Sequence, residues 1–309
     1  MSILLVFENK DVKPWADLLR AKLPNTRIEV YPDVKDKSLV DFLICWKPKK
    51  NLLNDFPNVK VIQSVGASID HITNSQTLNK HQQLTRIVDE NLSNDMWEFL
   101  LTVVLAEMKN IDRYRQSQRT KNWFPLSYNS IRSTSISILG LGCIGGYVAA
   151  KFAQLGFNIK GWSSSEKQIL GVESFTGDKG LDACLKDSDF LINLLPLTDK
   201  TRDILNKEIL QKLLNHAFFI NVGRGEHLVE SDLIDLIDSS KLAGALLDVF
   251  RTEPLPLEHP FWNHPKIQIT PHIASLTNVI SAADQIIENY RRFQNKEDLL
   301  HRVSIEKGY

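Results

Sequence analysis

The 309-residue chain has little cysteine and no excess of charge of either sign. Its three cysteines, Cys45, Cys143 and Cys184, lie far apart, and none belongs to a CxxC or Cys/His cluster. A disulfide framework or a structural zinc site is therefore not expected, and no metal site is predicted. Lysine plus arginine and aspartate plus glutamate both number 37, so the formal net charge is +0. This balance gives no support to a nucleic-acid or membrane partner.

Long apolar runs are also absent. The N-terminal stretch "ILLVF" is short and is followed at once by charged residues, so it predicts a first strand and not a signal peptide. No stretch approaches the length that crosses a membrane. We therefore expect a cytoplasmic protein.

What the sequence contains is an alternation of β-rich runs with helical patterns. Because 309 residues are many for a single core, two domains are expected. The strand-like runs include residues 3–7, 59–64, 135–140, 158–162, 189–195, 218–222 and 267–270. Such alternation predicts an α/β fold with parallel sheets and crossover helices. Two long helical patterns, 94–118 and 278–295, would connect an N-terminal sheet with a central one and return the chain to the first domain.

A glycine-rich turn opens the central region in "SISILGLGCIGGYVAAKF". Gly140, Gly142 and Gly145 have GxGxxG spacing between a strand and a helix. The first glycine permits a tight turn, the second lets the backbone approach a pyrophosphate, and the third allows the helix to pack on the strand. Cys143 and Ile144 begin the helix, whose N-terminal amides can bind phosphate. The pattern predicts a dinucleotide site; glycines that merely pack a turn are the alternative.

Three later segments place reactive side chains just after strands. The run "FFINVGRGEHLV" delivers Arg224 between two glycines, "GALLDVFRTEPLP" carries Glu253, and "ITPHIAS" carries His272. Parallel strands end at one edge of a sheet, where ligands of such folds bind. Histidine can protonate a carbonyl oxygen as hydride reaches the carbon, and a neighbouring carboxylate can keep it charged. The arginine fork fits a carboxylate. Taken singly, the histidine could be structural and the arginine a solvated loop residue.

These segments, in this order, resemble the D-isomer-specific 2-hydroxyacid dehydrogenases over nearly the whole chain. The motifs that carry the resemblance are "LGLGCIGG", "LINLLPLT", "NVGRGEHLVESDLIDLIDS", "GALLDVFRTEPLP" and "ITPHIAS". Within the family, "DFLICWKP", "INLLPLT", "DVFRTEPLP", "FWNHPKIQITPHIAS" and the terminal "KGY" are most similar to the bacterial glyoxylate/hydroxypyruvate reductase A group. The resemblance implies two Rossmann-like domains with the active site in the cleft between them.

The resemblance also implies roles for individual residues. Arg224 would orient the substrate, His272 would donate the proton, and Glu253 would keep His272 protonated. Asp248 would help to hold the nicotinamide carboxamide. The cofactor cleft would be lined by Leu195, Pro196, Val222 and Gly223.

Substrate contacts are implied in the first domain. The backbone amides that bind the carboxylate correspond to Ala67 and Ser68, although Ser68 replaces a usual glycine and narrows the permitted backbone geometry. Trp46 would close the substrate pocket, or it could be a core aromatic. Residues 1–94 with 277–309 would form the substrate domain and residues 95–276 the dinucleotide-binding domain. The helix from Asn94 would mediate a homodimer.

The expected reaction is reduction of a small 2-oxo acid, glyoxylate or hydroxypyruvate, to glycolate or to the D-2-hydroxy acid glycerate. Cofactor choice depends on the turn "SSSEKQ" after the second strand, where Ser163 replaces the acid of NAD-preferring domains. Ser163, Ser164, Ser165 and Lys167 could bind a 2′-phosphate, whereas Glu166 opposes it. We therefore expect NADPH to be preferred with NADH still used; the serines could also be only a polar turn.

Two other classes of function stay open. A dinucleotide-sensing regulatory protein could have the same fold, although it would not need Arg224, Glu253 and His272 together. A Rossmann methyltransferase would need only a glycine-rich turn and would leave the same three residues unexplained. A turnover assay tests the first alternative, and thermal shifts with NADPH and S-adenosylmethionine test the second.

Overall fold

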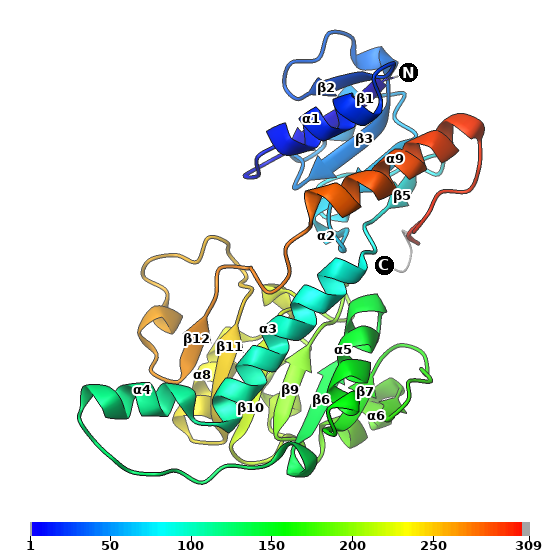
Figure 1. Ribbon diagram of the computed structural model, residues 1–309. Coiled ribbons are helices and arrows are strands. Elements are labelled where there is room, and N and C mark those ends of the chain that lie inside the picture. The colour runs from blue at the N-terminus through cyan, green and yellow to red at the C-terminus, as the bar shows by residue number, and fades with distance from the viewer. Residues whose placement is uncertain (1, 305–309) are drawn as a thin grey trace. The chain divides into compact units, whose positions relative to one another are not determined.

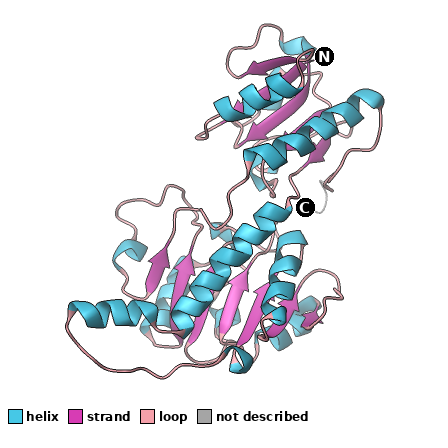
Figure 2. Cartoon of the chain, viewed as in Figure 1, coloured by secondary structure: helices cyan, strands magenta, loops and turns pink. Residues whose placement is uncertain are grey.

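The computed structural model describes residues 2–304 and consists of two compact units (Figure 1). Met1 and residues 305–309, which include the terminal "KGY", lie outside the described part of the chain. One unit comprises Met1–Leu92 and Thr277–Tyr309 and is called the terminal unit; the other, Ser93–Leu276, is called the central unit. Each has strands and helices alternating along the chain (Figure 2). The predicted α/β class is confirmed.

The terminal unit is built on a five-stranded parallel sheet of order β2-β1-β3-β4-β5. Its strands are β1 (Ser2–Phe7), β2 (Arg27–Val30), β3 (Val40–Trp46), β4 (Val61–Ser64) and β5 (Gln83–Thr85). Its helices are α1 (Lys13–Lys22), α2 (Asp70–Thr73) and α9 (Val279–Asn295), with 3₁₀ turns η1 (Lys37–Leu39) and η2 (Leu52–Asp55). Alternate residues of a strand face opposite sides. Ile3 and Leu5 therefore pack with α1 and α9, and Leu4 and Val6 pack with η2 and α2.

Helix α9 joins this sheet although it comes from the far end of the chain. Asn278 caps it by accepting hydrogen bonds from the N–H groups of Ile280 and Ser281. The buried Asn289 donates to Gln63 Oε1 at 2.9 Å and accepts from Leu300 N at 2.7 Å. These bonds satisfy a polar group inside the core, and they fix the returning segment on β4.

The central unit contains a seven-stranded parallel sheet of order β12-β11-β10-β9-β6-β7-β8. Its strands are β6 (Ser135–Leu139), β7 (Asn158–Trp162), β8 (Val172–Phe175), β9 (Phe190–Asn193), β10 (Ala217–Asn221), β11 (Leu242–Leu247) and β12 (Ile267–Ile269). The chain starts at β6, builds outward to β8, and then returns to β9 on the other side of β6. Such a reversal is the switch point at which doubly wound sheets bind dinucleotides.

Helices cover both faces of this sheet. They are α3 (Glu90–Met108), α4 (Ile111–Arg119), α5 (Cys143–Gln154), α6 (Gly177–Leu185), α7 (Lys207–Leu210) and α8 (Glu230–Asp238), with 3₁₀ turns η3 (Ile131–Ser133), η4 (Gly225–His227) and η5 (Pro260–Asn263). Ile136, Ile138 and Ile220 pack with α3 and α5, whereas Phe219 and Leu247 pack with α6, α7 and α8. In Figure 1, α3 crosses one face of the sheet.

The helical pattern predicted over 94–118 is divided in the structure. Helix α3 ends at Met108 and α4 begins at Ile111, because Asn110 takes a left-handed conformation with φ 55°. Asparagine tolerates this region better than most residues. Its buried side chain donates to Ser127 O at 3.1 Å. A contact distant in sequence therefore stabilises a break within a periodic pattern.

Candidate active site

The glycine-rich turn joins β6 to α5. Gly140 has φ 101°, and a Cβ placed on it would lie 2.5 Å from Leu194 O. A Cβ on Gly145 would lie 1.8 Å from Gly140 O. At Gly142, by contrast, a Cβ would meet nothing within 4 Å, and this residue is the N-cap of α5 without a side-chain cap. The helix start at Cys143 and Ile144 is thus open to an anionic group, and the turn fits a dinucleotide pyrophosphate.

The two glycines beside Arg224 are required by protein packing. A Cβ on Gly223 would lie 2.8 Å from Asn193 Nδ2, and one on Gly225 would lie 1.9 Å from the carbonyl carbon of Phe250. Glycine is therefore needed at both positions by contacts within the protein itself, whether or not a cofactor approaches. Arg224 itself is partly buried, and its Nη1 donates to Gly223 O at 2.6 Å.

His272 and Glu253 are in contact. His272 Nδ1 lies 2.9 Å from Glu253 Oε2 and 3.1 Å from Oε1. The side chains are 33% and 23% exposed, so both are partly shielded and still reachable. Because an ionised carboxylate only accepts, Nδ1 carries the hydrogen and Nε2 is the nitrogen available to a substrate. Glu253 Oε1 also lies 3.2 Å from Phe250 N, which donates to it.

Asp248 holds the turn that carries His272. His272 has φ 56°, a left-handed conformation uncommon for a residue with a side chain. Asp248 is 1% exposed; its Oδ1 accepts from Thr270 Oγ1 at 2.6 Å and Ile273 N at 2.8 Å, and its Oδ2 accepts from Ala274 N at 3.0 Å. Both oxygens are therefore engaged by the turn. A contact of Asp248 with a nicotinamide carboxamide stays a prediction.

The segments that carry Arg224 and Glu253 are fastened together. Arg251 Nε donates to Leu228 O at 2.9 Å, and its Nη2 contacts Asp203 Oδ1. Together with the close packing of Gly225 on Phe250, these bonds join the end of β10 to the end of β11. The positions of the Arg224 and Glu253 backbones are thus coupled.

Three further residues predicted at the cofactor lie at strand ends of the same sheet. Leu195 and Val222 are 7% and 6% exposed and follow β9 and β10, whereas Pro196 is exposed. Leu195 N donates to Asn193 Oδ1 at 3.2 Å, which bends the chain directly after β9. These residues, Gly223 and the glycine-rich turn lie beyond the carboxyl ends of neighbouring parallel strands.

In the turn after β7, one of the serine hydroxyls is hydrogen-bonded to the backbone of the turn itself. Ser163 is buried, and its hydroxyl donates to Ser165 O at 2.7 Å. The hydroxyl hydrogen of Ser163 is therefore used within the turn. Ser164, Ser165 and Lys167 are exposed, and residues 166–170, 172 and 174, which include Lys167, line a cavity of 440 Å³. A phosphate at this turn would meet these exposed residues first.

Trp46, Ala67 and Ser68 lie in the terminal unit at the ends of β3 and β4. The Trp46 ring lies 4.7 Å from the His71 ring, and Lys10 Nζ lies 5.0 Å from the Trp46 ring centre. Ala67 and Ser68 are partly exposed and lie in the turn after β4, which ends at Ser64. The Ser68 carbonyl accepts from Ser64 Oγ at 2.8 Å, which shapes this turn.

Sequence reasoning did not find Asn193, Asn221 and His227, which are all 0% exposed. Asn193 contacts both Asn221 and His227, and Asn221 donates to Arg224 O. Each asparagine is the last residue of its strand, and a strand that ends in a polar residue before glycine or proline was the available signal. The signal is weak because nothing in the sequence brings residues 28 to 34 positions apart together.

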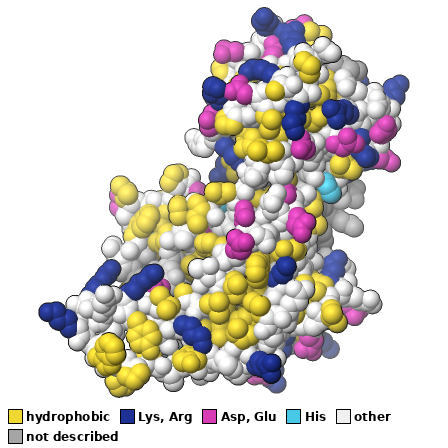
Figure 3. Space-filling view, viewed as in Figure 1, with side chains coloured by type: hydrophobic (Ala, Val, Ile, Leu, Met, Phe, Trp, Pro, Cys, Tyr) yellow, Lys and Arg dark blue, Asp and Glu magenta, His cyan; other side chains and the backbone are white. Residues whose placement is uncertain are grey.

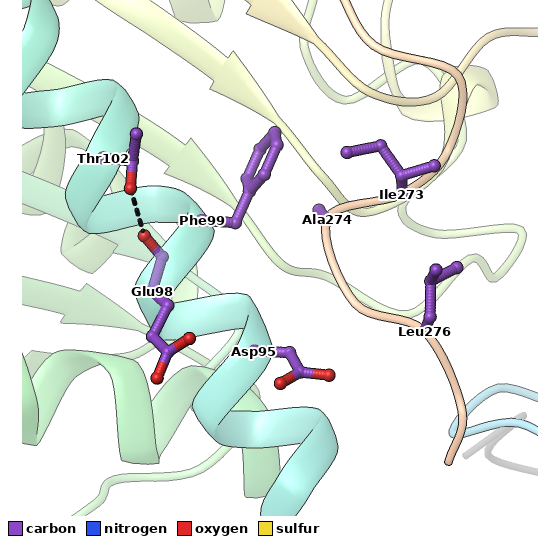
Figure 4. A pocket seen from close by; sticks show the side chains of 7 residues that line it. All are labelled: Asp95, Glu98, Phe99, Thr102, Ile273, Ala274 and Leu276. Atoms are coloured by element: carbon purple, nitrogen blue, oxygen red, sulfur yellow. Dashed lines mark hydrogen bonds between the residues drawn. The ribbon is translucent and has the colours of Figure 1, made fainter. Parts of the chain in front are cut away.

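A separate cavity of 330 Å³ lies beside the His272 turn (Figure 4). Helix α3 contributes Asp95, Glu98, Phe99 and Thr102, and the segment after His272 contributes Ile273, Ala274 and Leu276. Thr102 Oγ1 donates to Glu98 O at 2.8 Å, and the Glu98 carboxylate accepts from Asn94 Nδ2 at 2.7 Å. None of the three predicted catalytic side chains lines this cavity. Among residues 2–304, no cluster of three or more His, Cys, Asp or Glu is placed to hold a metal.

Comparison with known proteins gives concordant matches. Residues 101–274 match the model of the D-isomer specific 2-hydroxyacid dehydrogenase NAD-binding domain. The chain is 35% identical to glyoxylate/hydroxypyruvate reductase A of Yersinia enterocolitica, with 100% of both chains covered. A D-isomer specific 2-hydroxyacid dehydrogenase of Xanthobacter autotrophicus solved with NADPH and MES is 34% identical, with 100% of both chains covered and a TM-score of 0.93.

An NADPH-dependent glyoxylate/hydroxypyruvate reductase of Sinorhizobium meliloti, solved with NADP and sulfate, is 33% identical, with a TM-score of 0.93 and 100% of both chains covered. The two solved relatives each contain the phosphorylated dinucleotide. Within the described part of the chain, no helix combines the length and apolar character needed to cross a membrane.

Proposed function

Because the chain belongs to the D-isomer-specific 2-hydroxyacid dehydrogenase family, whose members are NAD(P)-dependent, we propose that it reduces glyoxylate to glycolate or hydroxypyruvate to D-glycerate. The observation that carries the proposal is the 2.9 Å contact of His272 with Glu253 on the sheet edge where Arg224 also emerges. The choice of oxo acid is supported by the names of two full-length relatives at 35% and 33% identity.

The side chains of this edge divide the chemistry among them. When bound, the reduced nicotinamide supplies a hydride to the carbonyl carbon of the oxo acid. His272 Nε2 gives a proton to the carbonyl oxygen, while Nδ1 stays bonded to the Glu253 carboxylate, which stabilises the charged ring before transfer. The Arg224 guanidinium binds the substrate carboxylate through two N–H groups and polarises the adjacent carbonyl. The Nη1 bond to Gly223 O limits the rotation of the guanidinium and so helps to orient it.

The proposed cofactor is NADPH, with NADH also used. No carboxylate stands at Ser163, at the end of β7, to repel a 2′-phosphate. Lys167 can add charge from the exposed part of the turn, and Ser164 and Ser165 can add hydrogen bonds. Because the Ser163 hydroxyl already donates to Ser165 O, its direct contribution is small. Glu166 lowers the preference for NADPH further, so we expect a modest ratio of kcat/KM for NADPH to kcat/KM for NADH.

The two units have different roles in this proposal. The central unit is the dinucleotide-binding domain, in agreement with the family model that matches residues 101–274. The terminal unit is the substrate domain, and Trp46, Ala67 and Ser68 are its substrate contacts. Trp46 suits this role because it is only partly buried and is held in place by His71 and Lys10.

A homodimer is part of the proposal. Exposed aromatic side chains follow α4, and among them Trp123 is 98% exposed and Phe124 and Tyr128 are each 64% exposed. Figure 3 shows hydrophobic side chains gathered over α3 and the segment after α4. Contiguous apolar surface of this kind marks interfaces. A second copy of the chain is the proposed partner, and analytical ultracentrifugation decides between monomer and dimer.

The experiment that tests the proposed activity compares initial rates of NADPH oxidation with glyoxylate, hydroxypyruvate, pyruvate and pyruvamide. Turnover is expected with the oxo acids and not with pyruvamide, because the neutral amide offers Arg224 no carboxylate. NADPH binding without turnover of any oxo acid would favour the regulatory protein instead. Equal turnover of pyruvate and pyruvamide would show that carboxylate recognition is misassigned.

A further inference from the structure

Three fully buried polar residues form a network directly under the Arg224 turn. Asn193 ends β9, Asn221 ends β10, and His227 lies in η4; each is 0% exposed. Asn193 Nδ2 lies 2.9 Å from Asn221 Oδ1 and 2.9 Å from His227 Nδ1. Asn221 Nδ2 donates to Arg224 O at 3.1 Å, and Asn221 Oδ1 accepts from Gly223 N at 3.2 Å. The network thus connects two strand ends to the turn that presents the arginine.

The neighbours of His227 determine which of its ring nitrogens carries hydrogen. Nδ1 lies 3.2 Å from Arg224 N, which can only donate. Asn193 presents its amide nitrogen to the same Nδ1, because its oxygen accepts from Leu195 N. Nδ1 is therefore an acceptor, and the hydrogen is on Nε2, which lies 3.2 Å from Pro196 O. His227 in this arrangement is neutral, with the Nε2–H tautomer.

The two ring nitrogens thereby contact two different parts of the proposed site. Nδ1 holds the Arg224 peptide N–H, and Nε2–H holds the Pro196 carbonyl. Asn193 and His227 pack tightly against the Gly223 backbone, since a Cβ on Gly223 would lie 2.8 Å from Asn193 Nδ2 and 3.2 Å from His227 Nδ1. A displacement of the ring would therefore move both backbone segments.

We propose that His227 is a positioning residue: through Nδ1 it sets the Arg224 turn that binds the substrate carboxylate, and through Nε2–H it sets the Pro196 segment at the dinucleotide. This inference rests on the proposed function for the roles of the two segments. A buried and fully bonded network also contributes to stability. The test must therefore separate positioning from a general effect on folding.

Two substitutions of His227 test the roles of its two ring nitrogens separately. The amide oxygen of His227→Asn replaces the acceptor near Nδ1 but cannot reach Pro196 O. The amide nitrogen of His227→Gln replaces the donor near Nε2 but leaves Arg224 N without its acceptor. His264→Gln is the control, because His264 lies outside the network and contacts Asp238 Oδ1 at 3.2 Å.

Binding is measured as the Kd of NADPH by fluorescence and the Kd of oxamate, a carboxylate analogue of the oxo acids. His227→Gln should weaken oxamate by roughly tenfold and leave NADPH within about twofold, the size expected for one lost hydrogen bond. His227→Asn should show the reverse pattern, and His264→Gln should change neither. Equal changes in both constants for the two variants, or no change in either, would overturn the proposal.

Failure of this proposal can be told apart from failure of the proposed function, because the Kd of NADPH and the Kd of oxamate are equilibrium values that need no turnover. Wild-type protein that binds NADPH but not oxamate would refute the substrate assignment on which the proposal rests. If neither variant folds, ¹⁵N-histidine NMR of the wild-type protein tests the contacts directly. The expected His227 signal is the Nε2–H tautomer; an Nδ1–H tautomer or a charged ring would contradict the proposal.

Discussion

Cys143 allows the dinucleotide site to be probed without any substitution in the catalytic residues. It is exposed and is the first residue of α5, at the open helix start beside Gly142. The other two cysteines, Cys45 and Cys184, are each 0% exposed. Burial raises the pKa of the Cys184 thiol to about 12 and also raises the pKa of Cys45. A maleimide, which reacts with the thiolate, should therefore label Cys143 alone in the folded protein.

Bound NADPH should protect this thiol, because its pyrophosphate would cover the start of α5. Only the unliganded fraction would react, so labelling should slow by about a hundredfold at an NADPH concentration of about 100 times its Kd. Labelling is followed by mass spectrometry of the intact protein and its peptides at about pH 8, where a thiol with a pKa of about 12 is ionised in about one molecule in ten thousand. Cys143→Ser is the control and should abolish labelling. An unchanged rate at saturating NADPH would refute the placement of the cofactor at this turn.

The remaining predictions concern substitutions of four single side chains. Arg224→Lys keeps the charge but loses the planar fork, so kcat/KM for glyoxylate should fall by about 10- to 100-fold; wild-type kinetics would mean that the guanidinium does not hold the carboxylate. Lys167→Gln should raise the KM of NADPH by about two- to fivefold, the size of an exposed ion pair, and leave the KM of NADH unchanged. Ser163→Asp should shift the cofactor preference toward NADH. Values of kcat/KM that favour NADH in the wild-type protein would contradict the proposed preference for NADPH. Asp248→Asn places an amide nitrogen against the donors of the His272 turn. It should lower the free energy of unfolding, measured by urea titration, by about 2 to 3 kcal/mol. Asp238→Asn is the control and should not lower it, because that carboxylate is 68% exposed.

The fold follows from the sequence where its signals are local. Gly140, Gly142 and Gly145 need only their own spacing and a preceding strand to indicate the turn between β6 and α5. Apolar runs such as residues 218–222 predict buried parallel strands for the same reason. The break at Asn110 was missed because the 3.6-residue period continues across it, and the residue that stabilises the break, Ser127, lies 17 positions away.

The candidate site was less accessible to sequence reasoning, because its geometry depends on contacts between separate segments. The sequence predicts that Arg224, Glu253 and His272 each follow the end of a strand. It does not predict the 2.9 Å contact of His272 with Glu253. The reason for Gly223 became visible only with Asn193 beside it. Ser163 was predicted to offer a hydroxyl to phosphate, and the structure shows that hydroxyl bonded to Ser165 O, a contact set by the local turn.

The central claim, that His272 protonates a 2-oxo acid on an NADPH-bound enzyme, is tested most directly by His272→Ala. Glyoxylate turnover with NADPH should fall by about two to four orders of magnitude, the range for a positioned general acid. The Kd of NADPH, measured in parallel, should stay near the wild-type value, because the substitution leaves the glycine-rich turn that would bind the pyrophosphate unchanged. Near-normal turnover in this variant would remove His272 from the mechanism and contradict the account.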